Sequence, residues 1–352
     1  MTDPRGRAGD DQVGWTSAEV RDPVEQDFDR ALRPQSLEDF VGQDRLRTNL
    51  RVAISAARAR DEPLDHVLFC GPPGLGKTSL AWLLAREMGT DIKVSSGHAL
   101  TAPRDLAGLL TSLGRGEILF LDEIHRLPRA VEEFLYAAME DHAIDVTLDK
   151  GPAARSLRLH LQPFTLVGAT TREGLLAAPF RARFGIVERL EPYPEDDLVR
   201  ILERAAGRLS LRMQPEAARE VARRSRGIPR VTLRLQRRLR DLAQVRNRDS
   251  LDLATTREGL AALGVDELGL VELDRALLRA LAERGGAPVG LRTLAAAVGE
   301  AEDTLEAVYE PYLLQLGFLS RTPRGRVATP RALAHLGLGR SGRGEGLFGD
   351  GA

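Results

Sequence analysis

Cysteine is almost absent from this 352-residue chain, which contains one, Cys70. A single cysteine cannot form an internal disulfide or a cysteine-rich zinc module, so both kinds of stapled fold are excluded. Cys70 lies in an apolar segment, which favours a buried core residue over a nucleophile. The chain also lacks an apolar run of membrane-spanning length, and its first residues lack the apolar core of a secretory signal. We therefore expect a cytoplasmic protein.

Lysine is nearly as scarce. The chain has three, Lys77, Lys93 and Lys150, against 47 arginines in a Lys+Arg total of 50, while the net charge is only −1. A composition that avoids lysine has kept Lys77 inside a glycine-rich stretch, where a compact point charge suits the chemistry better than a planar guanidinium.

That stretch, residues 71–79, reads GPPGLGKTS and fits the phosphate-binding pattern G-x-x-x-x-G-K-[ST] at every fixed position. A short apolar segment precedes it and predicts a buried strand, and the residues after it predict a helix. Backbone N–H groups of such a loop surround a polyphosphate at a helix N-terminus. Lys77 would then reach the β and γ phosphates, and the Thr78 hydroxyl would bind Mg²⁺. A glycine-rich turn without a ligand is the weaker alternative.

Two carboxylates end a second apolar segment, at residues 118–123. The carboxyl ends of parallel strands carry the ligand sites of open α/β folds. Asp122 would hold Mg²⁺ there, and Glu123 would orient and deprotonate an attacking water. A polar turn is the alternative, but Asp122 follows Lys77 by 45 positions (122 − 77), and together the two motifs predict hydrolysis of a nucleoside triphosphate. Further strands are expected at residues 91–94 and 164–169.

Residues 195–264 show a helical pattern and are locally basic. Between Arg200 and Arg257 there are 16 arginines against 6 acidic residues. A nucleic-acid partner and a solvated arginine-rich helix face explain this charge equally well.

Residues 144–161 alternate between apolar and polar on both sides of a glycine-containing loop, which predicts a hairpin. We expect it to project as a docking surface rather than to pack as an edge hairpin on its own domain.

The last part of the chain predicts helices at residues 274–284 and 291–298, a longer helix from Glu302 through Leu316, and a short hairpin around residues 322–326. This order is typical of a winged helix, a fold that binds DNA in most settings and other proteins in some. Arg321, Arg324 and Arg326 would meet backbone phosphates. Polar, glycine-rich tails are expected at residues 1–29 and 337–352.

Several of these segments together resemble a known family. The glycine loop, the DEIH box at residues 122–125, GATTR at 168–172 and RARFG at 181–185 are similar to AAA+ ATPases. More narrowly, LRP at 32–34, VGQ at 41–43, AMED at 138–141, GPAAR at 151–155 and RTPRGR at 321–326 are similar to the RuvB family of Holliday junction branch-migration motors. The likeness runs from about Leu32 to about Leu336.

The resemblance implies further site residues. Thr171 would sense the γ-phosphate, with Thr170 as its rival, and Arg183 would be an arginine finger offered to a neighbouring subunit, with Arg181 as its rival. Arg230 would be the sensor arginine of the lid. The remaining implied nucleotide-binding residues are Leu32, Arg33, Gly74, Gly76, Ser79, Glu140, Asp141, His142 and Tyr193. His125 is expected to be structural.

The resemblance also implies the fold and the partners. We expect an α/β protein with a large AAA+ parallel-sheet domain at residues 30–193, a small all-α lid at 194–264 and a winged-helix domain at 265–336. It implies a homo-hexamer that uses ATP and Mg²⁺ to move Holliday junctions on duplex DNA, with a RuvA-like protein at the hairpin 144–161 and a RuvC-like resolvase in the same complex. A nucleotide switch that loads a protein on DNA is the first alternative, and a winged-helix regulator with structural ATP is the second.

Overall fold

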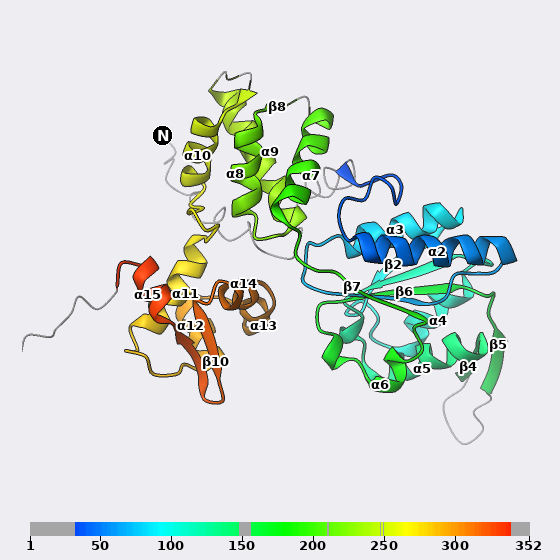
Figure 1. The fold of residues 1–352 in the computed structure, drawn as a ribbon. Helices are drawn as coiled ribbons and strands as arrows, with labels where there is room; N and C mark the ends of the chain where they lie inside the picture. The colour runs from blue at the N-terminus through cyan, green and yellow to red at the C-terminus, as the bar shows by residue number, and fades with distance from the viewer. Residues whose placement is uncertain (1–31, 148–155, 210, 247, 249, 339–352) are drawn as a thin grey trace, which may run out of the picture.

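The computed structural model describes residues 32–147, 156–209, 211–246, 248 and 250–338. The chain folds into three parts that follow one another in sequence (Figure 1). The expected tail at 1–29, nearly all of the expected tail at 337–352 and the tip of the expected hairpin lie outside the described residues. Within them, no helix combines the length and apolar character needed to cross a bilayer.

A five-stranded parallel sheet forms the centre of the large domain, in the order β2-β3-β6-β1-β7. Its strands are β1 (Val67–Cys70), β2 (Ile92–Ser96), β3 (Ile118–Asp122), β6 (Thr165–Thr170) and β7 (Ile186–Arg189). The expected strands are all present. β7 was not expected, because this short edge strand is only half-buried and carries charged residues that hide its pattern.

Helices cover both faces of the sheet (Figure 1). α2 (Asp44–Arg60) and α3 (Lys77–Met88) pack on Val67 and Phe69, whereas α4 (Pro103–Thr111) and α5 (Arg129–Asp141) pack on Leu68 and Cys70. Successive residues of a strand point to opposite faces, so a strand between two helical layers is apolar throughout. Three short helices complete the domain: η1 (Ile124–Arg126), η2 (Glu173–Leu175) and α6 (Ala178–Arg181).

The predicted hairpin is formed by β4 (Ala143–Thr147) and β5 (Ser156–His160), which pair antiparallel and separately from the main sheet. Ile144 is buried against the large domain, whereas 45% of the Leu157 side chain remains exposed. The base of the hairpin is therefore anchored, and an apolar residue farther along it faces solvent.

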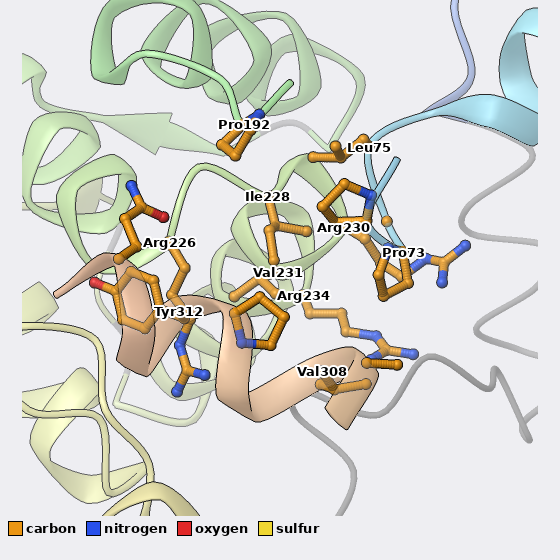
Figure 2. Close-up of a pocket in the computed structure, with 15 residues that line it drawn as sticks. Pro73, Leu75, Pro192, Arg226, Ile228, Arg230, Val231, Arg234, Val308 and Tyr312 are labelled. Carbon is orange, nitrogen blue, oxygen red and sulfur yellow. The ribbon is translucent and has the colours of Figure 1, made fainter. Parts of the chain in front are cut away.

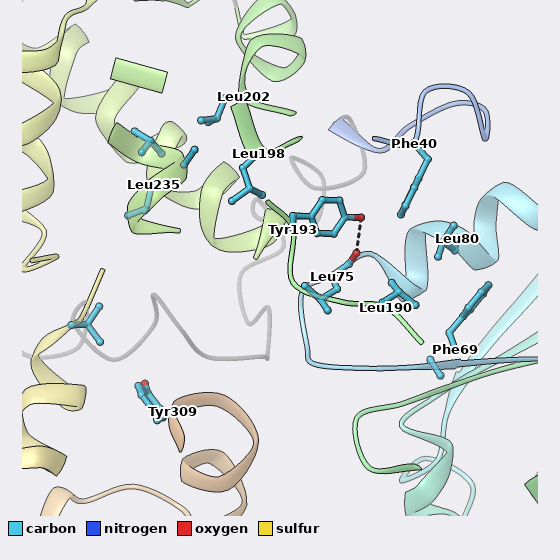
Figure 3. Close-up of a cluster of buried hydrophobic side chains, with 14 of the residues drawn as sticks. Phe40, Phe69, Leu75, Leu80, Leu190, Tyr193, Leu198, Leu202, Leu235 and Tyr309 are labelled. Atoms are coloured by element: carbon cyan, nitrogen blue, oxygen red, sulfur yellow. Dashed lines mark hydrogen bonds between the residues drawn. The ribbon is translucent and has the colours of Figure 1, made fainter. Parts of the chain in front are cut away.

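The lid consists of α7 (Glu195–Arg208), α8 (Pro215–Arg224), α9 (Pro229–Val245) and α10 (Leu253–Ala262). A two-stranded parallel sheet, β8 (Arg212–Met213) with β9 (Ser250–Leu251), joins its loops and was not expected. Tyr193 joins the lid to the glycine loop: it is buried, and its hydroxyl donates to the carbonyl oxygen of Leu75 (Figure 3).

The arginines of the lid include several that serve its own structure. Arg224 binds Glu220 inside the lid, and both side chains are almost fully buried. Arg226 binds Asp274 of the next domain with side-chain exposures of 2% and 0%, and its Nε donates to the carbonyl oxygen of Gly269. A buried, hydrogen-bonded pair of this kind fixes the lid to the winged helix, because a lone buried charge would be costly. Part of the basic charge is thus explained without a nucleic acid.

The last domain has the expected winged-helix order: α11 (Glu272–Ala282), α12 (Leu291–Val298), a third helical segment, the wing strands β10 (Leu319–Thr322) and β11 (Gly325–Ala328), and α15 (Pro330–His335). The third segment differs from the single helix that we expected. It consists of α13 (Glu302–Thr304), the π-helical turn η3 (Leu305–Tyr309) and α14 (Glu310–Gln315). Such π turns widen a helix locally and are frequent at functional sites.

Candidate nucleotide site and DNA wing

The glycine loop lies between β1 and α3, as the motif requires. Gly74 and Gly76 have φ angles of 81° and 107°, a region that other residues rarely adopt. A Cβ at position 74 would also lie 2.8 Å from the Cγ2 of Ile228 in the lid. Glycine is therefore needed here both for the conformation of the loop and for its contact with the lid. Ser79 follows in the first turn of α3.

Lys77 is 6% exposed, and its ammonium donates to the carbonyl oxygens of Gly71 and Pro72 at 2.6 and 2.9 Å. Burial lowers the pKa of Lys77 to about 8, although the carboxylates of Glu123 and Asp122 oppose this shift. A buried ammonium that is held by loop carbonyls, with two carboxylates nearby, is suited to exchange these partners for phosphate oxygens.

Thr78 and Asp122 provide oxygen atoms next to each other, with the Thr78 hydroxyl 3.5 Å from the Asp122 carboxylate. Burial and the neighbouring Glu123 raise the pKa of Asp122, so its negative charge is costly without a cation. Hard oxygen donors beside a phosphate-binding loop are the ligands that Mg²⁺ takes. These residues therefore fit the magnesium ion that the sequence predicted.

Glu123 is held in a left-handed backbone conformation with φ 48°. Its carboxylate accepts a hydrogen bond of 3.0 Å from the Thr171 hydroxyl and lies 3.2 Å from Nδ1 of His125. The same His125 nitrogen is 2.9 Å from the hydroxyl of Thr170. Burial lowers the pKa of His125, which favours its neutral form. The ends of β3 and β6 thus meet in one polar cluster, in which Thr171 contacts Glu123 and Thr170 contacts His125.

The lid closes over the glycine loop through Arg230, whose backbone N–H donates to the carbonyl oxygen of Gly74 at 3.3 Å. A cavity opens beside this contact (Figure 2). Its wall comes from the glycine loop, the lid and the third helical segment of the winged helix. The labelled residues facing it include Pro73, Ile228, Arg230, Val308 and Tyr312.

Leu32 and Arg33, which we expected on the adenine side of the site, contact the lid. Leu32 is buried, and its carbonyl oxygen accepts a hydrogen bond from Arg204 of α7. The carbonyl oxygen of Arg33 accepts one from Arg208, while its guanidinium lies 5.8 Å from the centre of the Trp82 ring on α3. The segment before α2 thus bridges α3 and α7.

Arg183 lies away from these groups and contacts α5. Its guanidinium donates to the Tyr136 hydroxyl at 2.6 Å and to the Glu140 carboxylate at 2.7 Å. Asp141 pairs instead with Arg158 of the hairpin, and His142 packs edge-on against Phe164. The rival Arg181 pairs with Glu173 at 3.4 Å. Arg183 and Glu140 form a separate cluster on the domain surface.

The wing arginines differ in their environments. Arg321 and Arg326 both bind Glu310, which is completely buried. The Arg321 side chain nevertheless remains 46% exposed, and that of Arg326 16%. Arg324 lies in the turn between the wing strands, is exposed, and forms no ion pair with any described residue. Main-chain bonds between Val289 and Arg326 hold the wing against its domain.

Models of protein families match all three parts of the chain. The RuvB P-loop domain of the Holliday junction DNA helicase matches residues 32–190, the RuvB AAA lid domain matches 193–266, and the RuvB C-terminal winged-helix domain matches 267–337. The chain belongs to the RuvB family. Its large domain is therefore a P-loop ATPase domain of the AAA+ type, and the predicted fold class is confirmed.

Curated relatives in the RuvB family are similar over nearly their whole length. The subunits RuvB of the Holliday junction branch migration complex from Chlorobaculum parvum and Chloroflexus aggregans are each 56% identical, over 89% and 90% of this chain and 92% and 91% of their own. The solved RuvB Holliday junction branch migration motor of Thermotoga maritima is 48% identical, with a TM-score of 0.80 over 87% of this chain and 98% of the other.

Some groups at these sites were missed by reasoning from the RuvB-like motifs. Glu310 carried no signal, because a single acid in a predicted helix is usually solvated. His125 was expected to be structural, and its contact with Glu123 was not foreseen. Its place in the DEIH box was the one available signal. The contribution of Val308 and Tyr312 to the cavity depends on how the domains pack, which the sequence does not show.

Proposed function

We propose that this protein is an ATP-driven motor subunit that moves Holliday junctions during recombination and repair of DNA. The observation that carries the proposal is the direct bond between Thr171 and Glu123 beside Lys77 and Asp122, in a chain that also has a winged helix. A regulator that only binds ATP has no need for a carboxylate held by a hydroxyl at the end of the neighbouring strand. Names of relatives more than 50% identical support junction migration as the output.

In the proposed mechanism, the loop N–H groups and Lys77 would hold the phosphates, while Thr78 and Asp122 would hold Mg²⁺. The ion would neutralise charge that develops on the transferred phosphoryl group. Glu123 accepts a proton from the attacking water. The single hydroxyl proton of Thr171 is donated to Glu123 in the structure described, and it would turn toward the γ-phosphate when ATP is bound. Gly76 and Ser79 belong to the same phosphate site.

Arg183 is assigned to the nucleotide of a neighbouring subunit. It lies with Glu140 on the domain surface, and we assign Glu140, Asp141 and His142 to the same shared site. An arginine finger of this kind raises the hydrolysis rate by about 10³ to 10⁵. A finger that serves another subunit requires an oligomer, and we propose a homo-hexameric ring.

The adenine would lie against Leu32, Arg33 and Tyr193, with Arg230 reading the nucleotide from the lid. Apolar walls suit a base, and the side chains of Leu32 and Tyr193 are buried. We propose domains at residues 30–193, 194–264 and 265–336, with the lid and winged helix moving together because Arg226 and Asp274 join them.

The wing and the hairpin are the two parts of the chain that we assign to binding partners. Duplex DNA would meet Arg324 at the wing tip together with Arg321 and Arg326, and hydrolysis would be stimulated by DNA. The hairpin would receive a RuvA-like junction-binding protein through exposed apolar residues such as Leu157. A RuvC-like resolvase would act in the same complex. We place this activity in the cytoplasm.

The test compares the wild type with Glu123→Gln in ATP hydrolysis and in dissociation of a synthetic four-way junction, with and without a RuvA-like protein. Glu133→Gln is the matched control, because it makes the same change in an exposed surface pair with Arg129. We expect junction dissociation to require ATP and to increase when the RuvA-like protein is added. It should be lost in Glu123→Gln and kept in Glu133→Gln. ATP turnover without movement of the junction would instead favour a loader or switch.

A further inference from the structure

The third helical segment of the winged helix carries an acidic face toward the large domain. Asp303 of α13 binds Arg172 at 3.0 Å and lies 3.7 Å from Arg126, and Glu306 of η3 binds Arg172 at 3.3 Å. In many winged helices this helix enters the DNA major groove. Here its acidic residues oppose such a role, since they would repel phosphates, and they pair with arginines of the ATPase domain instead.

Arg172 occupies a special place in that domain. It directly follows Thr171, and its backbone N–H donates to the hydroxyl of Thr170 at 3.0 Å. Its side chain is 27% exposed and reaches two carboxylates of the winged helix. A displacement of the end of β6 therefore moves the docking partner of the third helical segment.

The same segment holds the DNA wing. The Oε2 atom of Glu306 faces Arg172, while its Oε1 atom lies 3.9 Å from Arg321 and 3.6 Å from Arg326. Both wing arginines also bind the buried Glu310, one helical turn farther along. Glu306 is thus shared between the arginine at the phosphate sensor and the two arginines at the DNA wing.

Sharing of one carboxylate makes these two sites interdependent. When DNA phosphates attract Arg321 and Arg326, these two arginines interact less strongly with Glu306. The Glu306 carboxylate then interacts more strongly with Arg172. By linkage, a nucleotide that shifts Arg172 changes DNA affinity by the same factor as DNA changes nucleotide affinity. The packing of Val308 and Tyr312 on the cavity beside the glycine loop gives this segment a second contact with the nucleotide side (Figure 2).

We infer that Arg172, Asp303 and Glu306 form a relay of positioning residues that couples the γ-phosphate side of the ATP site to the DNA wing. The inference rests on the proposed function, in which the wing binds DNA and Thr171 senses the phosphate. The relay acts directly between the large domain and the winged helix, in addition to any movement of the lid.

The coupling is measured as a ratio of two affinities. The full-length protein binds a fluorescein-labelled duplex in the presence of Mg²⁺ with either ADP or a non-hydrolysable ATP analogue, and the Kd values are compared by fluorescence anisotropy. For the wild type, we expect the larger of these two Kd values to exceed the smaller about fivefold or more. Arg172→Gln should bring this ratio close to one and Asp303→Ala should lower it, with little change in the affinity for ADP.

Glu302→Ala is the matched control, because it removes an acid from the same helical turn whose carboxylate pairs with neither Arg126 nor Arg172 among the described contacts. It should keep the wild-type ratio. Thermal unfolding of each variant checks that the fold is intact, and Arg172→Lys, which keeps a positive charge beside Asp303 and Glu306, should retain part of the ratio. A purely structural contact would lower the melting temperature without changing the ratio.

An unchanged ratio in both Asp303→Ala and Arg172→Gln overturns the relay, as does a wild-type ratio of one. The junction assay on the same preparations separates this failure from that of the proposed function. If the wild-type protein dissociates junctions while both variants keep the full ratio, only the relay is refuted. Wild-type protein that hydrolyses ATP and leaves junctions intact refutes the motor.

Discussion

The hydroxyl of Thr171 donates a hydrogen bond of 3.0 Å to the carboxylate of Glu123, which directly links the proposed phosphate sensor to the proposed general base. The two residues are 48 positions apart and come together because β3 and β6 are neighbours in the sheet. The adjacent Thr170 points to His125 instead and is completely buried. Two successive threonines therefore have different environments, and their substitution should have different effects.

Thr171→Val should lower kcat for ATP hydrolysis roughly 10²-fold with little change in KM, because it removes the hydroxyl that orients the Glu123 carboxylate. Thr170→Val should mainly lower the free energy of unfolding, by about 1–3 kcal/mol, since it leaves buried partners without a hydrogen bond. Steady-state kinetics and urea unfolding of both variants provide the check. A larger loss of kcat in Thr170→Val would assign the sensor to Thr170.

Gly74→Ala should weaken nucleotide binding by roughly tenfold, because the added Cβ presses on Ile228 and Arg230 where the lid meets the loop. Gly89→Ala is the matched control: its φ of 70° is similarly left-handed, but a Cβ there meets no atom within 4 Å. The control should cost about 1–2 kcal/mol of stability from backbone strain alone and leave nucleotide affinity unchanged. Titration calorimetry with ADP distinguishes the two. Equal losses of affinity would remove the lid contact from the explanation.

Burial lowers the pKa of His66 to about 4, and its Nδ1 accepts a hydrogen bond from the backbone N–H of Leu166. Between about pH 6.5 and pH 4 the unfolded chain takes up a proton at this residue that the folded chain does not. The free energy of unfolding should therefore fall as the pH drops through this window, by at most about 3 kcal/mol. Above pH 6.5 the residue contributes no pH dependence.

Urea unfolding of the wild type and His66→Gln at pH 7 and pH 5 tests this expectation. The variant should be less stable at pH 7 because it disturbs the bond to Leu166, yet it should lose less stability on acidification. Other titrating groups are common to both proteins and cancel in the difference. Parallel pH profiles would show that His66 does not control this part of the acid sensitivity.

The core of the ATPase domain was predictable because β1, β3 and β6 are buried on both faces and appear as uninterrupted apolar runs. β7 was missed for the opposite reason, since Glu188 and Arg189 are tolerated only at an edge. The π-helical turn at residues 305–309 has the same apolar spacing as a continuous helix, so the pattern alone could not reveal it.

The motifs likewise marked the proposed phosphate-binding residues, but not the distant partners of the residues next to them. Arg172 and Asp303 are 131 positions apart, and nothing in either segment marks them as partners. The arginine-rich lid shows the same limit. The charge of Arg226 suggested a solvated or DNA-binding face, whereas the folded chain buries this residue against Asp274. Local patterns report burial and backbone conformation well, and pairings between domains poorly.

Arg324 should be the wing residue whose loss affects DNA binding without affecting the fold. Arg324→Ala removes an exposed cation, so it should weaken binding to duplexes of any sequence and reduce the salt dependence of log Kobs by about one. Arg321→Ala should also weaken DNA binding, but in addition it leaves the buried Glu310 with one partner fewer and should cost about 1–3 kcal/mol of stability. Anisotropy titrations over a series of salt concentrations, with thermal unfolding of both variants, separate these effects. An unchanged salt dependence in Arg324→Ala, together with a reduced one in Arg321→Ala, would move the phosphate contact from the tip of the wing to its base.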